Sequence, residues 1–256
     1  MKLSSLINCI VLSILIFNCQ EKTVYDTVIR NGTLIDGSGN SSFKGDLAIQ
    51  NDSIVAIGDI GNAIGENEID ASGLVVAPGF INMLSWATIS LIEDGRSMGD
   101  IKQGVTLEVF GEGWSMGPLN EDMKKQQMIA QGDIKFDIEW TKLSEYLKYL
   151  ERKGVSPNIA SFIGATTVRI HEVGMDDRPP TAEELDRMKA HVKQAMEEGA
   201  LGVGSSLIYA PAFYSSTEEL VELCKVASEY DGMYISHMRS EGSNILNSLG
   251  ELIRIA

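Results

Sequence analysis

The fold class of this chain turns on residues 74–86, which are Leu74-Val75-Val76-Ala77-Pro78-Gly79-Phe80-Ile81-Asn82-Met83-Leu84-Ser85-Trp86. Their apolar run from Val75 to Ile81 predicts a short buried strand. Before this run the chain has short alternating segments separated by turn residues. After it, apolar strands alternate with longer amphipathic segments, which implies a parallel sheet covered by helices. The sequence therefore predicts an α/β fold in which a different first module ends near residue 76.

That first module, residues 19–76, is predicted to be a small β-sandwich. Asn31-Gly32, Asp36-Gly37 and Asn51-Asp52 separate short runs with alternating apolar residues. Asn, Asp and Gly accept positive φ, so these dipeptides are strong signals for hairpin turns. We expect a turn at each of them.

Residues 77–256 are expected to form part of a (β/α)8 TIM-type barrel, with about five strand-helix units of the eight that the complete fold needs. Thr181, followed by Glu183 and Glu184, predicts the capped N-terminus of one of its helices. Strands are predicted at Val75 to Ile81, Val105 to Gly111, Asn158 to Ile163, Ala200 to Ser205 and Met233 to His237. Helices are predicted at Ile89 to Gln103, Trp140 to Arg152, Ala182 to Glu198, Thr217 to Tyr230 and Asn244 to Ala256.

Residues 1–18 have the layout of an export signal, with Lys2 followed by an uncharged run to Phe17 that is shorter than a membrane span. Ile16-Phe17-Asn18-Cys19 resembles a bacterial lipobox, which predicts lipidation of Cys19 and an exported, membrane-anchored lipoprotein. Ordinary cleavage and an uncleaved anchor are the alternatives. With Cys9 in the signal and Cys19 modified, Cys224 is left alone on the buried face of a helix, where we expect it to be inert.

The charge balance argues against nucleic acid as a partner. The 256 residues include 21 basic and 36 acidic side chains, for a net charge of −15. Such a surface repels polyanions. At the other end, the apolar segment 251–256 has no residue that would stop a helix, so we expect the chain to be the N-terminal part of a longer protein.

From Tyr25 onward the chain resembles the N-acyl-D-amino-acid deacylases, the D-aminoacylase branch of the amidohydrolase superfamily. The opening Ile29-Arg30-Asn31-Gly32-Thr33-Leu34-Ile35-Asp36-Gly37 and the passage Val76-Ala77-Pro78-Gly79-Phe80-Ile81 are typical of the superfamily. More specific to the deacylase branch are Asp176-Asp177-Arg178-Pro179-Pro180-Thr181, Leu207-Ile208-Tyr209-Ala210-Pro211 and Ser236-His237-Met238-Arg239-Ser240-Glu241-Gly242.

The resemblance implies a zinc centre, and this chain departs from its usual form. Leu84 and Trp86 occupy the places of the His-x-His at the end of the first barrel strand, and neither side chain can bind zinc. The cysteine that follows the second strand is also missing. Glu112 lies there and is a candidate ligand, since carboxylates bind zinc. His237 retains the histidine of strand five, so the resemblance implies a single zinc held by Glu112, His237 and a histidine beyond Ala256.

The resemblance places no catalytic residue within the chain, because the general-base aspartate of the family is expected beyond Ala256. Three residues are candidates for substrate binding. Arg239 offers a guanidinium for a substrate carboxylate, with a structural ion pair as the alternative. Tyr209 is expected in the substrate loop or in simple packing. His171 is expected near the substrate or on a surface loop, and His191 in solvent.

Two functions remain open from the sequence. The first is a metal-dependent amidohydrolase that cleaves the amide bond of small N-acyl-D-amino acids. The second is a ligand-binding lipoprotein without catalysis, favoured by Leu84, Trp86 and the missing cysteine. Leu84 and Trp86 would line the metal pocket with apolar surface. An inert product of a truncated reading frame is a third possibility.

Overall fold

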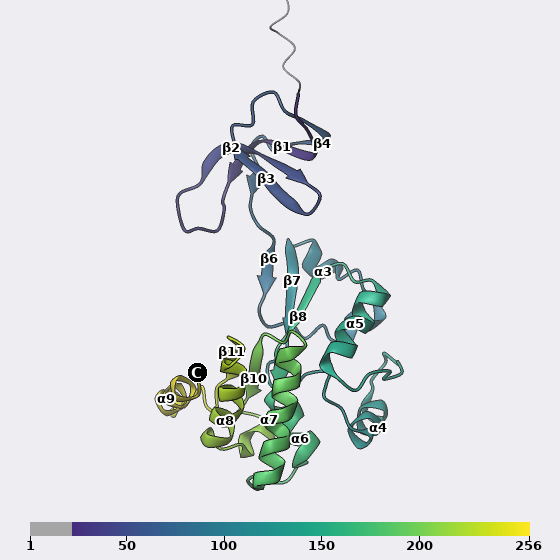
Figure 1. Ribbon diagram of the computed structural model, residues 1–256, viewed down its shortest axis with the longest axis vertical. Helices are drawn as coiled ribbons and strands as arrows, with labels where there is room; N and C mark the ends of the chain where they lie inside the picture. Colours follow the sequence, from purple (N-terminus) through teal and green to yellow (C-terminus); the bar gives the residue numbers. More distant parts are fainter. Residues whose placement is uncertain (1–21) are drawn as a thin grey trace, which may run out of the picture. The chain divides into compact units, whose positions relative to one another are not determined.

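The computed structural model describes residues 22–256, and the predicted signal and Cys19 lie outside the described residues. The chain divides into two compact units, one that extends to Pro78 and one that spans Gly79–Ala256 (Figure 1). Among the described residues, no helix has both the length and the apolar character that a membrane span requires.

The first unit is an all-β module, as the sequence predicts, but its described strands form a single sheet and not the two packed sheets of the predicted sandwich. Its strands join in one sheet in the order β3-β2-β1-β4, with β5 also paired to β1 (Figure 1). Val28, Leu34 and Ala48 are buried in it. The strands are β1 (Val24–Leu34), β2 (Phe43–Gln50), β3 (Ser53–Gly58), β4 (Ile64–Asp70) and β5 (Val75–Val76).

One of the three expected turns in this module is wrong. Asn51 has positive φ and joins β2 to β3, as predicted, but Asn31-Gly32 lies inside β1 as a bulge. The strand continues because Asn31 is bound on both sides: its amide N–H donates to Asp46 and its side chain donates to Asp70. An Asn-Gly pair supplies positive φ for a bulge as well as for a turn, and only tertiary partners decide between them.

The second unit contains parallel strands that follow one another in chain order. β7 pairs with β6 and β8, and β10 pairs with β9 and β11. Phe162, between β8 and β9, donates its N–H to the Phe110 carbonyl at 2.9 Å, which keeps this stretch on β7. This is the arrangement of an incomplete (β/α) barrel. The strands are β6 (Phe80–Asn82), β7 (Val105–Phe110), β8 (Asn158–Ser161), β9 (Ile163–Gly164), β10 (Gly202–Ser206) and β11 (Met233–His237).

The predicted strand Val75 to Ile81 is two strands in the structure. β5 closes the first unit and β6 opens the second, with Ala77-Pro78-Gly79 between them. Pro78 has no N–H for a ladder hydrogen bond, so a strand breaks there readily. The apolar run thus supplies one short strand to each sheet.

The helices differ most from prediction where they are short. The helix expected at Ile89 to Gln103 is wrong: two single turns, α2 (Ser90–Glu93) and α3 (Met98–Ile101), stand there, separated by Ser97 with φ of 43°. α4 (Glu121–Ala130) and α6 (Ala165–Glu172) were not predicted. The longer helices were predicted to within three residues at each end: α5 (Leu143–Lys153), α7 (Ala182–Glu197), α8 (Thr217–Ser228) and α9 (Ile245–Ile255).

Candidate active site

The loop after β7 places Glu112 at the end of the parallel sheet. Gly111 and Gly113, on either side, have φ of 99° and 84°, a backbone conformation that suits glycine. A Cβ on Gly111 would lie 2.2 Å from the Phe162 carbonyl oxygen, and one on Gly113 would lie 2.5 Å from the Ser206 Cβ. Two glycines therefore let this loop lie directly on the neighbouring strands.

Hydrogen bonds fix the same loop from α6. The Thr166 N–H donates to the Gly113 carbonyl at 3.0 Å, and the Ser115 N–H donates to the Thr167 hydroxyl at 2.8 Å. The Ser115 hydroxyl in turn accepts the Gly164 N–H at 2.9 Å. The backbone that follows Glu112 is thus held by the next strand-helix unit.

His237 is the last residue of β11 and faces Ser206 of β10 in the parallel register. Its carbonyl accepts the Leu207 N–H at 2.8 Å, so pairing continues past the end of β10. The Ser236 hydroxyl donates to the same carbonyl at 3.0 Å. The carboxyl ends of adjacent parallel strands are where α/β barrels hold their functional side chains.

The structure brings these two candidate zinc ligands together. His237 Nδ1 lies 4.0 Å from Glu112 Oε2, with the side chains 25% and 12% exposed. Burial raises the pKa of Glu112 above its ordinary value; a charged His237 opposes this rise, and Glu241 adds to it. Glu241 also lies near the other imidazole nitrogen, with Oε1 3.4 Å from His237 Nε2. A carboxylate oxygen from the loop after β7 and an imidazole nitrogen from the end of β11 therefore lie close enough to be candidate ligands of one ion.

Aromatic side chains surround this pair. The Tyr209 ring meets the His237 ring edge-on, with centroids 5.3 Å apart. Trp86 and Trp114 line a cavity of about 70 Å³ together with Glu112. Trp86 thus lines the same cavity as Glu112, in the place that the family resemblance gives to a metal-binding histidine.

Arg239 is engaged in structural contacts. Its Nη2 lies 2.8 Å from Glu251 Oε1, and its remaining donors bind Glu251 and the carbonyls of Phe213 and Ser215. The guanidinium also lies over the Phe213 ring. This geometry favours the structural ion pair over a substrate contact, with Glu251 of α9 as the partner.

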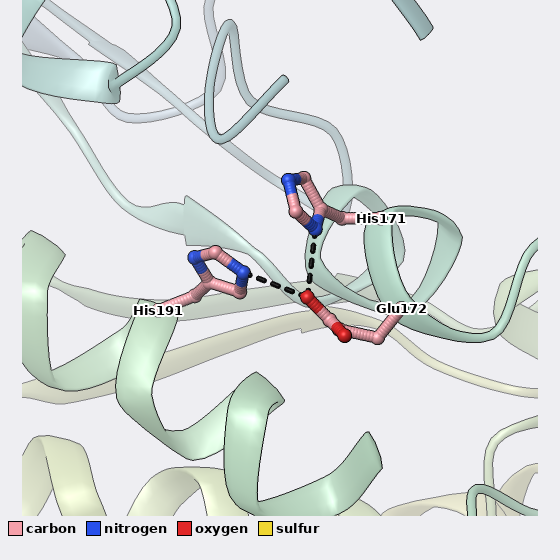
Figure 2. Close-up of side chains that lie close together, drawn as sticks. All are labelled: His171, Glu172 and His191. Atoms are coloured by element: carbon pink, nitrogen blue, oxygen red, sulfur yellow. Dashed lines mark hydrogen bonds and ion pairs between the residues drawn. The ribbon is translucent and has the colours of Figure 1, made fainter. Parts of the chain in front are cut away.

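His171 belongs to a cluster that sequence reasoning missed. It lies near the end of α6, and its Nδ1 is 2.8 Å from Glu172 Oε1. His191 of α7, expected in solvent, is half-buried and places Nε2 2.9 Å from the same oxygen (Figure 2). Burial lowers the pKa of His191 below its ordinary value, although its bond to Glu172 works in the opposite direction. The two histidines lie on different helices, so their spacing along the chain carries no periodic signal.

Comparisons with known proteins agree with this geometry. No protein-family model matches the chain. It is 35% identical over 235 residues to the D-aminoacylase of Alcaligenes xylosoxydans xylosoxydans, with 90% of this chain and 48% of the relative covered. A solved D-aminoacylase described by its binuclear metal center is 30% identical with a TM-score of 0.79, over 90% of this chain and 49% of that one.

The chain belongs to the D-aminoacylase branch of the amidohydrolases. A further solved member, N-acyl-D-glutamate deacylase from Bordetella bronchiseptica with zinc and a phosphonate inhibitor, is 28% identical with a TM-score of 0.79, over 92% of this chain and 49% of that one. The chain spans about half the length of the curated relatives it matches.

Glu112 and His237 carry donor atoms that fit part of a metal site. Glu112 and His237 are oxygen and nitrogen ligands of the kind zinc prefers, and they meet with partial burial. Leu84 and Trp86 offer no ligand atom at the end of β6. The residues therefore fit part of a metal site, and Leu84 and Trp86 contribute no ligand to it.

Proposed function

We propose that the protein is a metal-dependent amidohydrolase that hydrolyses N-acyl-D-amino acids or similar linear amides. The observation that carries this proposal is the 4.0 Å approach of Glu112, in the loop after β7, to His237, at the end of β11, in a chain of the D-aminoacylase branch. The substrate class follows that of the relatives, which include D-aminoacylase and N-acyl-D-aspartate deacylase.

A single zinc ion is proposed as the cofactor, with Glu112 and His237 as two of its ligands. When bound, zinc supplies Lewis-acid activation of water and of the amide carbonyl. A catalytic zinc takes about three protein ligands, so the proposal requires one more, which the family resemblance places beyond Ala256 together with a general-base aspartate. One solved D-aminoacylase is described as having one-metal activation and second-metal attenuation, which is consistent with a one-metal enzyme.

The side chains of this chain then have distinct tasks. Glu112 would hold the ion from a backbone position that the two flanking glycines set. Tyr209 fixes the His237 ring from one side. Trp86 and Trp114 supply exposed apolar surface at the cavity that Glu112 lines, which suits contact with the acyl chain of the substrate.

We also propose that the protein is exported and anchored through a lipid on Cys19. The motivation is the charge-free run before Cys19 and its lipobox-like context. Metabolic labelling with a palmitate analogue tests this: the wild-type protein should carry label and the Cys19→Ala variant should not. Label that persists in the Cys19→Ala variant would contradict lipidation at Cys19.

The enzymatic proposal is tested on the protein as its gene encodes it, by assay of N-acyl-D-amino acids before and after treatment with a chelator. Activity should disappear with the metal and return with zinc. Loss of a residue that only hydrogen-bonds a metal ligand can lower activity by roughly 100-fold. Because Glu112 is proposed to be a ligand itself, Glu112→Gln should lower kcat/KM by more than this. The matched control is Glu218→Gln, an exposed carboxylate on α8, which should leave kcat/KM unchanged.

A protein that folds but binds no zinc and hydrolyses no N-acyl amino acid would contradict the proposal. That outcome would favour a ligand-binding lipoprotein whose pocket is lined by Trp86 and Trp114. Activity that survives complete removal of metal would contradict the metal dependence alone.

A further inference from the structure

Two of the three histidines of the chain converge on one carboxylate away from the Glu112–His237 pair. His171 Nδ1 and His191 Nε2 lie 2.8 and 2.9 Å from the same oxygen, Glu172 Oε1. Figure 2 shows both rings directed at this oxygen, His171 from α6 and His191 from α7. The two ring centroids are 4.3 Å apart.

These atoms have the composition of a divalent-metal site. All three ligand atoms lie within 4.8 Å of one another. Two imidazole nitrogens and one carboxylate oxygen form a ligand set that zinc uses in proteins, at about 2.0 to 2.2 Å from each. Atoms that already meet within hydrogen-bond distance need only small side-chain shifts to surround an ion.

The Glu172 carboxylate has one oxygen left for a cation. Arg187 binds its second oxygen, Oε2, whereas Oε1 lies against the two imidazoles.

The cluster is accessible from outside. His171 and Glu172 line a surface cavity of about 680 Å³, together with Asn120 and Asp122. Water or a small ligand can thus reach the ion and complete its coordination. In contrast to a purely structural hydrogen-bond network, a site of this kind has a route of entry for the metal.

We propose that His171 Nδ1, a Glu172 carboxylate oxygen and His191 Nε2 form a second metal site, which binds a zinc-type divalent cation. The site lies between the end of α6 and the middle of α7, two helices that the Arg187 and His191 contacts to Glu172 already connect. It shares no ligand with the Glu112–His237 pair and does not depend on the proposed hydrolysis.

The test uses the 256-residue chain carrying Glu112→Gln and His237→Asn, so that the first pair cannot bind metal and, of the three histidines of this chain, His171 and His191 remain. After chelation, Co²⁺ and then Zn²⁺ are titrated in. We expect one Co²⁺ ion to bind per chain and to give the visible absorption of four- or five-coordinate Co²⁺. Zinc should displace the cobalt and abolish this absorption. Zinc should also raise the Tm in a concentration-dependent manner.

Further substitutions in this background assign the ligands. His171→Gln and His191→Gln should each weaken binding by more than about 100-fold, beyond what loss of a ligand's hydrogen-bond partner costs. Arg187→Gln keeps all three ligands and is the matched control, so it should bind cobalt at least as tightly. Cobalt binding that both histidine variants retain, or that Arg187→Gln abolishes, would overturn the proposal.

A second measurement needs no substitution at the site. The ¹⁵N resonances of the two remaining imidazoles distinguish the nitrogens within each ring. Zinc should shift Nδ1 of His171 and Nε2 of His191 and leave the other two nitrogens protonated. Resonances unchanged by a stoichiometric excess of zinc would contradict the site even if a variant fails to fold.

Discussion

Gly111 and Gly113 determine where the Glu112 carboxylate lies. The sequence predicted Glu112 between two glycines in a loop at a strand end, and this much is confirmed. The reason for the glycines was beyond sequence reasoning, because Phe162 and Ser206, which they contact, come from distant segments of the chain. The close approach of two backbone segments depends on the tertiary structure. The sequence shows the glycines but not the residues that they contact.

Gly113→Ala should therefore destabilise the protein through two effects. A left-handed backbone at a residue other than glycine costs about 1–3 kcal/mol, and the new Cβ would also meet Ser206 at 2.5 Å. Gly174→Ala is the matched control, since Gly174 has φ of 83° with nothing within 4 Å of its Cβ position. Urea unfolding should show the larger loss for Gly113→Ala. Equal losses would mean that the Ser206 contact is unimportant.

His191 shows why a histidine can be misplaced from local sequence. Its neighbours Lys189 and Lys193 suggested a solvated face, but residues two apart on a helix point in nearly opposite directions. The informative neighbours are Met188 and Ala195, at three and four residues, and both are buried. Helical spacing, used consistently, would have placed His191 at the edge of the buried face.

A buried ion pair connects α6 to α8. Arg169 and Glu219 are 0% and 2% exposed, with Nη1 2.7 Å from Oε2. Arg169 also donates to the carbonyls of Asp176 and Arg178, so it fastens the segment that leads into α7. Sequence reasoning identified neither partner, because a pair of residues on separate helices leaves no periodic pattern.

Glu219→Gln should cost roughly 3–5 kcal/mol in the free energy of unfolding, because it leaves the Arg169 charge buried and unpaired. Glu218→Gln on the same helix removes an exposed pair with Arg254, which is worth about 1 kcal/mol or less. Chemical denaturation of the two variants makes the comparison. If both lose the same small amount, the buried pair does not hold α6 to α8.

The start of α7 should make stability depend on acid pH. Thr181 and Glu184 form a reciprocal capping box, as the sequence predicted for the cap, and both Arg178 Nη atoms bind the Glu184 carboxylate at 2.7 and 2.8 Å. Chiefly through this Arg178 bond, the pKa of Glu184 falls from 4.5 to about 2. A lowered folded-state pKa contributes stability that is present above pH 4.5 and is lost as the pH falls toward 2.

We expect wild type to be more stable than Glu184→Gln by a constant margin above about pH 5 and by a shrinking margin below pH 4.5. Thermal unfolding of both proteins from about pH 2 to 7 measures this margin. A margin that stays constant over the whole range would show that the Glu184 charge does not stabilise the helix. Thr181→Ala should separately cost about 1 kcal/mol through loss of the cap.

Element prediction succeeded where local signals agreed. α7 and α8 each have an N-cap side chain, acidic first turns and a buried face with helical spacing. The failures are α2 and α3, where one periodic run breaks at Ser97, and α6, whose β-branched residues Thr166, Thr167 and Val168 suggest a strand. In α6 burial against β10 and α7 overrides this local preference.

At the scale of the whole chain, the prediction that α/β units follow a β module in the sequence is confirmed. The parallel strands of the second unit run in chain order. Within the described residues, β6 and β11 are paired on one side only. Phe80, Ile81 and Met233 on these edges are more than half exposed. Strands of this buried type are templates for association.

Residues 22–256 expressed alone should therefore self-associate in a concentration-dependent way. Sedimentation velocity over a range of concentrations measures this, and Ile81→Lys together with Met233→Lys should reduce it, since edge lysines oppose pairing. A monodisperse monomer at every concentration would contradict the expectation. The proposed hydrolysis does not depend on this result.

The most direct test of the proposed zinc site is anomalous diffraction at the zinc absorption edge from crystals of the protein as its gene encodes it, grown with zinc. We expect an anomalous peak about 2.0–2.2 Å from the Glu112 carboxylate and the His237 imidazole, with none beside Leu84 and Trp86. Zinc-loaded crystals with no peak between Glu112 and His237 would contradict a metal-dependent hydrolase built on this pair.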